Sequence, residues 1–158
     1  MNSSIAIFPG SFNPFTTGHL DIVERALKIF DKVIVAVGIN IEKQQISPID
    51  SDPEDFNVPQ NVKEIELLFE NYSRVEVMTY YGLTADLVKR TGATCIIRGI
   101  RNSADFEYEK KLSDVNLEVL GVETLLFPCR PSLSFVSSSM IRELKHFNIN
   151  PGNWIPKL

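Results

Sequence analysis

The chain has 158 residues, of which 44% are hydrophobic, and this is enough apolar material for the core of one domain. Its net charge of −4 argues against general nucleic-acid binding. No segment approaches the roughly 18 uninterrupted apolar residues of a membrane span, and the N-terminus lacks a signal-peptide pattern, so we expect a cytoplasmic protein.

A loop rich in glycine, proline and hydroxyl residues follows the first predicted strand. Residues 4–8 are apolar and typical of a buried strand, and residues 20–30 show apolar positions at helical spacing. Gly10 and Gly18 lie between them, and the hydroxyl residues there are Ser11, Thr16 and Thr17. Backbone N–H groups and the helix dipole favour phosphate at this point, and we expect His19 to face it. A plain connection and an ordinary cap-region histidine remain the alternatives, since neither common phosphate-loop fingerprint is present.

Further strands and helices alternate along the rest of the chain. Apolar runs predict strands at residues 33–37, 74–78, 94–97 and 124–127. Helical spacing predicts helices at residues 62–72, 84–90, 105–120 and 138–146. We therefore expect a single α/β domain over residues 1–158, with a Rossmann-like, doubly wound sheet of five parallel strands. In such a sheet, ligands bind at the carboxyl ends of the strands.

Basic residues follow two of these strands. Lys43 lies beyond the second strand, and Arg98 and Arg101 follow the fourth with Gly99 between them. Each could be a solvated surface residue. The carboxyl ends of parallel strands share one edge, however, so these side chains are expected to converge with His19, and guanidinium groups fit phosphate oxygens.

Other polar stretches have simple structural explanations. The acidic residues 105–109 open a helix and could only complement its dipole, and the serines at 137–139 could be N-caps, although three exceed what a cap needs and could cradle a triphosphate. The acidic, proline-rich residues 46–61 predict a flexible loop. Cys95 and Cys129 lack metal-site spacing and are expected to be buried small residues.

Two stretches resemble the signatures of the nucleotidylyltransferases. The T-x-G-H pattern at residues 16–19 follows P-G-S-F-N-P, and S-S-S-M-I-R occupies residues 137–142 near the C-terminus. The run R-G-I-R at residues 98–101, followed by D-F-E-Y-E at 105–109, narrows the resemblance to the bacterial phosphopantetheine adenylyltransferase family. That family joins the AMP part of ATP to 4′-phosphopantetheine, giving dephospho-coenzyme A and pyrophosphate.

The resemblance also implies roles for individual residues. His19, Lys43 and Arg98 are implied to be catalytic, with His19 stabilising the transition state. The implied ATP-binding residues are Ser11, Phe12, His19, Gly99, Ile100, Arg101, Glu109, Leu133, Ser134, Phe135, Val136, Ser137, Ser138 and Ser139. The implied acceptor-binding residues are Ser11, Lys43, Thr84, Arg98 and Asn116. Mg²⁺ is expected on the phosphate oxygens with few protein ligands, and the family usually forms homo-hexamers.

The chain departs from the family pattern at a few positions. Ser11 replaces a common threonine, Asn13 replaces a common aspartate, and the basic residues usual near Gln44 and Asn61 are missing. A sister enzyme with another acceptor, such as nicotinamide mononucleotide or glycerol phosphate, remains an alternative. A nucleotide-binding module without catalysis is the other, and its expected mark is the loss of His19 or Lys43.

Overall fold

The computed structural model describes residues 3–39 and 59–158. The main elements are β1 (Ile5–Gly10), α1 (Thr17–Ala26), β2 (Lys32–Gly38), α2 (Gln60–Leu68), β3 (Val75–Tyr80), α3 (Thr84–Thr91), β4 (Cys95–Ile100), α4 (Ser103–Val115), β5 (Glu123–Pro128) and α5 (Ser138–His146). The described residues also form the short helical turns η3 (Asn116–Leu120), η4 (Pro131–Leu133) and η5 (Gly152–Trp154). No helix within the described ranges has the length and apolar character needed to cross a membrane.

The strands form one parallel sheet with the order β3-β2-β1-β4-β5, counted over the described residues. This confirms the predicted doubly wound architecture. The chain runs outward from β1 through β2 to β3, then returns to β4 on the other side of β1. The carboxyl ends of β1 and β4 therefore diverge into loops on opposite sides, which is the position where such sheets bind ligands.

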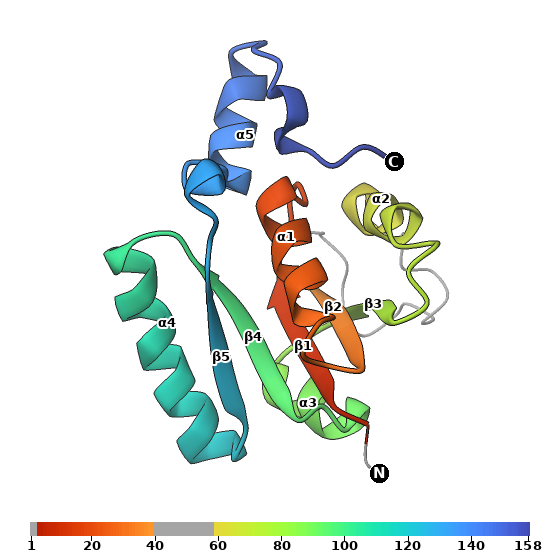
Figure 1. The fold of residues 1–158 in the computed structure, drawn as a ribbon, viewed down its shortest axis with the longest axis vertical. Coiled ribbons are helices and arrows are strands. Elements are labelled where there is room, and N and C mark those ends of the chain that lie inside the picture. Colours follow the sequence, from red (N-terminus) through yellow and green to blue (C-terminus); the bar gives the residue numbers. More distant parts are fainter. Residues whose placement is uncertain (1–2, 40–58) are drawn as a thin grey trace, which may run out of the picture.

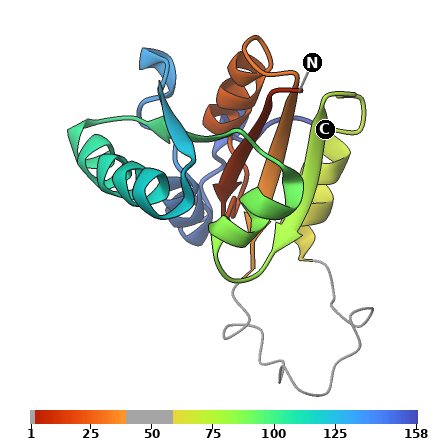
Figure 2. The same cartoon turned by 90° about the horizontal axis from the view of Figure 1, so that it is seen from below.

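Helices cover both faces of the sheet, and this explains the apolar runs of its central strands β1 and β2. Figures 1 and 2 show α1 and α2 on one face and α3 and α4 on the other. Ala6 and Phe8 of β1 pack with α1 and α2, whereas Ile7 between them packs with α3. In β2 all five residues from Val33 to Val37 are buried. A strand buried on both sides needs apolar residues at every position.

Several elements end at different places from those predicted; α2, for example, ends at Leu68 rather than residue 72. The first helix stops at Ala26, and Leu27 and Phe30 pack against the core from the turn that follows it. The fourth strand continues to Ile100 rather than residue 97, because Arg98 pairs with Leu126 of β5 in the sheet. Arg98 is thus held on the rigid strand and not on a loop. Of the predicted acidic loop, residues 46–58 lie outside the described part of the chain.

Candidate active site

The loop after β1 is shaped by the ring of Phe12. Phe12 is only 3% exposed and has a φ of 46°, a left-handed backbone conformation that is uncommon outside glycine. Its ring centroid lies 5.0 Å from that of His19 and 5.1 Å from that of Phe8. A side chain expected to contact ATP is therefore mostly in the core, where it supports the imidazole of His19.

Gly10 leaves the room that this ring needs. A Cβ on Gly10 would lie 2.9 Å from the tip of the Phe12 ring, closer than carbon atoms normally approach. We expect Gly10→Ala to displace Phe12 and to lower the free energy of unfolding by about 1–3 kcal/mol, the usual cost of overpacking. Urea unfolding of the variant measures this. Gly18→Ala is the control, because a Cβ on Gly18 would have its nearest contact at 3.4 Å, with the Thr16 hydroxyl. Gly82→Ala would not serve, because Gly82 has a positive φ that strains any other residue.

His19 is held in one tautomer by the start of α1. The backbone N–H of Thr16 donates to Nδ1 of His19 over 3.0 Å, and the His19 N–H donates to the Thr16 hydroxyl over 3.2 Å. Since a backbone N–H can only donate, Nδ1 must accept and the proton of the neutral ring lies on Nε2. Burial, with the positive charges of Arg101 and Arg98, lowers the pKa of His19 to about 3. The imidazole is thus a neutral hydrogen-bond donor at neutral pH.

The lowered pKa of His19 predicts an acid-sensitive fold. Its pKa rises from about 3 in the folded protein to 6.5 when unfolded, so the unfolded state binds more protons between these values. The contribution of neutral His19 to the stability of the fold is fully present above pH 6.5 and is lost as the pH falls toward 3. Denaturant unfolding at a series of pH values should show that the free energy of unfolding falls less on acidification in His19→Gln than in wild type. An equal loss of stability in both proteins would contradict a neutral His19 in the folded state.

The hydroxyl groups of the predicted phosphate loop serve the fold. Thr16 is 1% exposed, and its hydroxyl caps α1. The Thr17 hydroxyl donates to the carbonyl of Trp154 over 3.3 Å. Both hydroxyls, which were expected near the bound phosphate, therefore have partners within the protein. Ser11, in contrast, lies at the cavities described below.

Both predicted arginines carry a carboxylate partner. Arg98 makes a two-pronged contact with Glu109 of α4, at 2.8 Å and 2.7 Å. Arg101 makes a similar contact with Asp105, at 2.8 Å and 3.2 Å, and this hydrogen bond holds the pKa of the Asp105 carboxyl below its usual range. Arg98 also donates to the carbonyl of Pro9. The two guanidinium groups are therefore oriented before any ligand binds.

The three serines at the start of α5 make different hydrogen bonds. Ser137 is the N-cap, because its hydroxyl accepts from the N–H of Met140 over 3.1 Å. The Ser138 hydroxyl donates to the carbonyl of Pro14 over 2.7 Å, which ties this loop to the β1–α1 loop. The Ser139 hydroxyl accepts from Arg142 over 3.3 Å. The capping explanation is correct for Ser137, and the N-terminal end of α5 still presents its backbone N–H groups to the same space.

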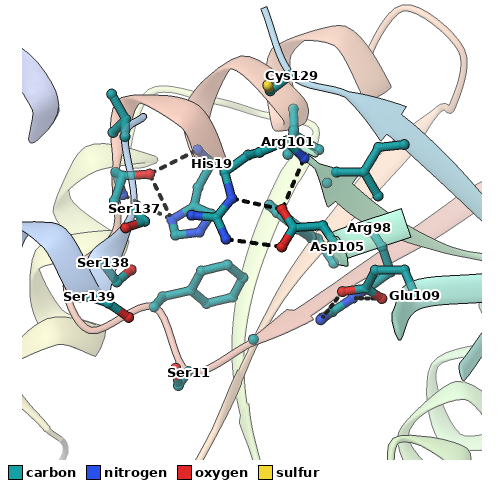
Figure 3. Close-up of a pocket in the computed structure, with 18 of the residues that line it drawn as sticks. Ser11, His19, Arg98, Arg101, Asp105, Glu109, Cys129, Ser137, Ser138 and Ser139 are labelled. Carbon is teal, nitrogen blue, oxygen red and sulfur yellow. Dashed lines mark hydrogen bonds and ion pairs between the residues drawn. The ribbon is translucent and has the colours of Figure 1, made fainter. Parts of the chain in front are cut away.

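Two adjoining cavities lie at the carboxyl ends of the strands. The first, of about 300 Å³, is drawn in Figure 3, with the serines and the Arg98–Glu109 pair on opposite sides of His19 in that view. Its lining residues are Phe8, Pro9, Gly10, Ser11, Phe12, Thr16, His19, Ile22, Arg98, Gly99, Ile100, Arg101, Asp105, Glu109, Cys129, Val136, Ser137, Ser138 and Ser139. The second, also about 300 Å³, is lined by Pro9, Gly10, Ser11, Gly38, Tyr80, Thr84, Ile96, Arg98, Glu109, Leu112 and Asn116. Ser11 and Arg98 belong to both cavities.

These cavities gather most of the predicted site residues. Among the described residues that were predicted, Leu133, Ser134 and Phe135 line neither cavity, and the Phe135 ring packs instead on Trp154 at 5.3 Å. Lys43 lies outside the described residues. Cys95 is buried as expected, but Cys129 is only half-buried and lines the first cavity, which corrects its assignment to the core.

Several residues of this region were not predicted as site residues, and three of them contact a predicted one. Thr16 fixes the His19 tautomer, and it could have been found from the sequence because it is the first residue of the T-x-G-H pattern. Asp105 orients Arg101 and stands at the start of the D-F-E-Y-E run. Tyr80, whose hydroxyl lies 3.3 Å from that of Thr84 in the second cavity, is an ordinary strand residue and carries no sequence signal.

Comparison with known proteins identifies the family. A family model described as cytidylyltransferase-like matches residues 7–144. A protein of Porphyromonas gingivalis named phosphopantetheine adenylyltransferase is 45% identical to this chain, over 99% of this chain and 97% of its own length. The chain belongs to the phosphopantetheine adenylyltransferase family. The resemblance seen in the sequence signatures is thereby confirmed.

A second relative agrees with this assignment, and a more distant solved structure shares the fold. The protein of that name from Cytophaga hutchinsonii is 43% identical over 98% of this chain and 97% of its own length. The solved structure of a bifunctional NMN adenylyltransferase/ADP ribose pyrophosphatase from Francisella tularensis superposes with a TM-score of 0.66 at 17% identity. It covers 98% of this chain and 45% of that protein, and at this identity it shows the fold alone.

Proposed function

We propose that this protein transfers the adenylyl group of ATP to 4′-phosphopantetheine, giving dephospho-coenzyme A and pyrophosphate. The observation that carries the proposal is the pair of cavities that share Ser11 and Arg98, with His19 beside them. Two substrates bound there would meet at the residues common to both cavities. Membership of a family whose curated members carry this enzyme's name supports the same reaction.

The first cavity suits ATP. The N-terminal end of α5 and the guanidinium group of Arg101 would attract the phosphates of a nucleotide bound in it, and Glu109, Gly99 and Ile100 line its wall. The second cavity suits the acceptor, because Leu112 offers an apolar surface and Thr84 and Asn116 offer polar atoms for an amide-bearing arm. Asn116 donates to the Thr124 hydroxyl over 3.1 Å, so its side-chain carbonyl is free of that bond.

The chemistry requires no side-chain base. An acceptor phosphate oxygen is already an anionic nucleophile, and its attack forms a bond to the α-phosphorus of ATP. The bond from that phosphorus to the bridging oxygen of pyrophosphate breaks, and pyrophosphate leaves with the electron pair. The Nε2–H of His19 donates to the oxygens on which charge develops, while Arg98 holds the acceptor phosphate. Lys43 is proposed to share this second role.

Mg²⁺ is proposed to accompany ATP. Among the described residues no group of three or more histidine, cysteine or acidic side chains could hold a metal ion. The two carboxylates that line the first cavity, Asp105 and Glu109, each bind an arginine. The ligands of Mg²⁺ would therefore come mainly from phosphate oxygens and water, the usual preference of this ion.

We also propose that the protein works as a homo-oligomer, a hexamer by family resemblance, in the cytoplasm. Apolar side chains on α4 support an assembly, because Phe106, Tyr108 and Val115 are 46%, 61% and 55% exposed in the single chain. Light scattering coupled to size exclusion measures the mass. A monomeric mass at micromolar concentration would contradict the oligomer and leave the reaction untouched.

The test of the reaction is pyrophosphate release from ATP and Mg²⁺ with different acceptors. Release with 4′-phosphopantetheine, together with the mass of dephospho-coenzyme A, is the expected result. Release only with nicotinamide mononucleotide or glycerol phosphate would move the protein to a sister activity. No release with any acceptor would leave nucleotide binding without transfer as the function.

A further inference from the structure

Asn61 reaches the catalytic loop from outside both cavities. It lies in the first turn of α2, and its side-chain amide nitrogen donates to the carbonyl oxygens of Ser11 over 3.1 Å and Phe12 over 3.3 Å. Carbonyl oxygens only accept, so these two partners settle the orientation of the amide. Asn61 lines neither of these two cavities, so its contact with them runs through the loop.

The two carbonyls that Asn61 holds belong to the part of the loop that forms the site. Ser11 lines both cavities, so the position of its backbone sets the wall between the two substrates. Phe12 adopts its left-handed φ of 46°, which costs free energy for a residue with a side chain and persists only where the surroundings hold it. Asn61 supplies two hydrogen bonds that favour this conformation.

The effect of Asn61 on Phe12 also reaches His19. The Phe12 ring meets the imidazole nearly at right angles, with an interplanar angle of 83° and centroids 5.0 Å apart. The Thr16 N–H fixes the imidazole through Nδ1, while Phe12 limits its movement from the side. A change in the backbone at Phe12 therefore alters the direction in which the Nε2–H points.

We propose that Asn61 is a positioning residue for adenylyl transfer, acting through Ser11 and Phe12 on the wall between the substrates and on His19. This inference rests on the proposed function for its kinetic readout. We expect Asn61→Ala to lower kcat about tenfold, close to the net worth of one or two hydrogen bonds, with the KM of both substrates within about twofold. The aspartate in Asn61→Asp has the same shape but cannot donate to the carbonyls, so kcat should fall at least as much in this variant.

Gln60 offers a matched control. It occupies the neighbouring position of α2, and its amide contacts Glu64 on the same helix over 3.3 Å instead of the loop. Gln60→Ala should leave kcat unchanged. Equal losses in Gln60→Ala and Asn61→Ala would overturn the proposal, because a general effect on α2 would then explain both.

A second readout is independent of the reaction. The chain has two histidines, so the ring resonances of His19 and His146 are readily told apart in NMR spectra of the intact protein. Asn61→Ala should shift the His19 resonances and leave those of His146 in place. Unchanged His19 resonances together with unchanged kcat would refute the positioning role. If wild type forms no product, the reaction assignment fails and the His19 resonances alone decide this inference; if Asn61→Ala does not fold, Asn61→Ser replaces it.

Discussion

Replacing His19 with alanine should lower kcat about 10²- to 10³-fold, the usual loss when a donor to a charged transition state is removed. The neutral ring presents its Nε2–H to the first cavity because the Thr16 N–H occupies Nδ1. The affinity for ATP should remain within a few-fold, since Arg101 and the N-terminal end of α5 are untouched. Steady-state rates and calorimetric titration with ATP measure the two quantities separately.

Two further variants sharpen the His19 experiment. His19→Gln places an amide N–H near the position of Nε2 and should recover part of the lost rate. His146→Ala removes the other histidine, which lies in the last turn of α5, and should have no effect on kcat. Full activity in His19→Ala would refute the assigned role, and a loss of ATP binding equal to the loss of kcat would indicate a ground-state contact instead.

Replacing Arg98 with alanine should have the second largest effect, lowering kcat/KM for the acceptor about 10²-fold, as expected for loss of a charge-assisted two-pronged contact. It should also destabilise the fold. Glu109 has a side chain only 8% exposed, and without Arg98 its carboxylate is left without its partner. We expect a loss of about 1–3 kcal/mol, below the range for fully buried pairs because 26% of the Arg98 side chain is exposed.

A double variant separates these two effects of Arg98. Arg98→Ala combined with Glu109→Ala removes both charges, so the stability should recover relative to Arg98→Ala while acceptor turnover stays low. Arg130→Ala is the control, since Arg130 also binds a carboxylate, that of Asp21, but lies outside both cavities as described. Recovery of turnover in the double variant would show that Arg98 acts only by neutralising Glu109.

The fold was predictable because its central strands are buried on both faces. A run such as residues 33–37 has no polar position, and this pattern is typical of a parallel sheet covered on each side. The ends of the elements were less predictable. Leu27 and Phe30 keep the helical apolar spacing although the helix has ended, because the turn still faces the core. Arg98 looked like a loop residue because pairing with β5 is a tertiary contact.

The site was predictable where short motifs sit at strand and helix ends. His19, Arg98 and Arg101 meet around one space because the sheet brings β1 and β4 side by side. The contacts that individual side chains make were not predictable. Phe12 turned inward because Gly10 leaves space for its ring, and Phe135 turned toward Trp154. Asn61 is 50 residues from Ser11 in the chain, so no local pattern reveals their contact.

The carboxylate partners of Arg98 and Arg101 also influence how substrates arrive. Asp105 and Glu109 cancel most of the positive field of the two guanidinium groups, and the whole chain carries a net charge of −4. Long-range attraction for polyanions is therefore weak, and encounter should occur by diffusion with little dependence on ionic strength. A phosphate that binds Arg98 or Arg101 therefore meets a guanidinium group that is already paired with a carboxylate.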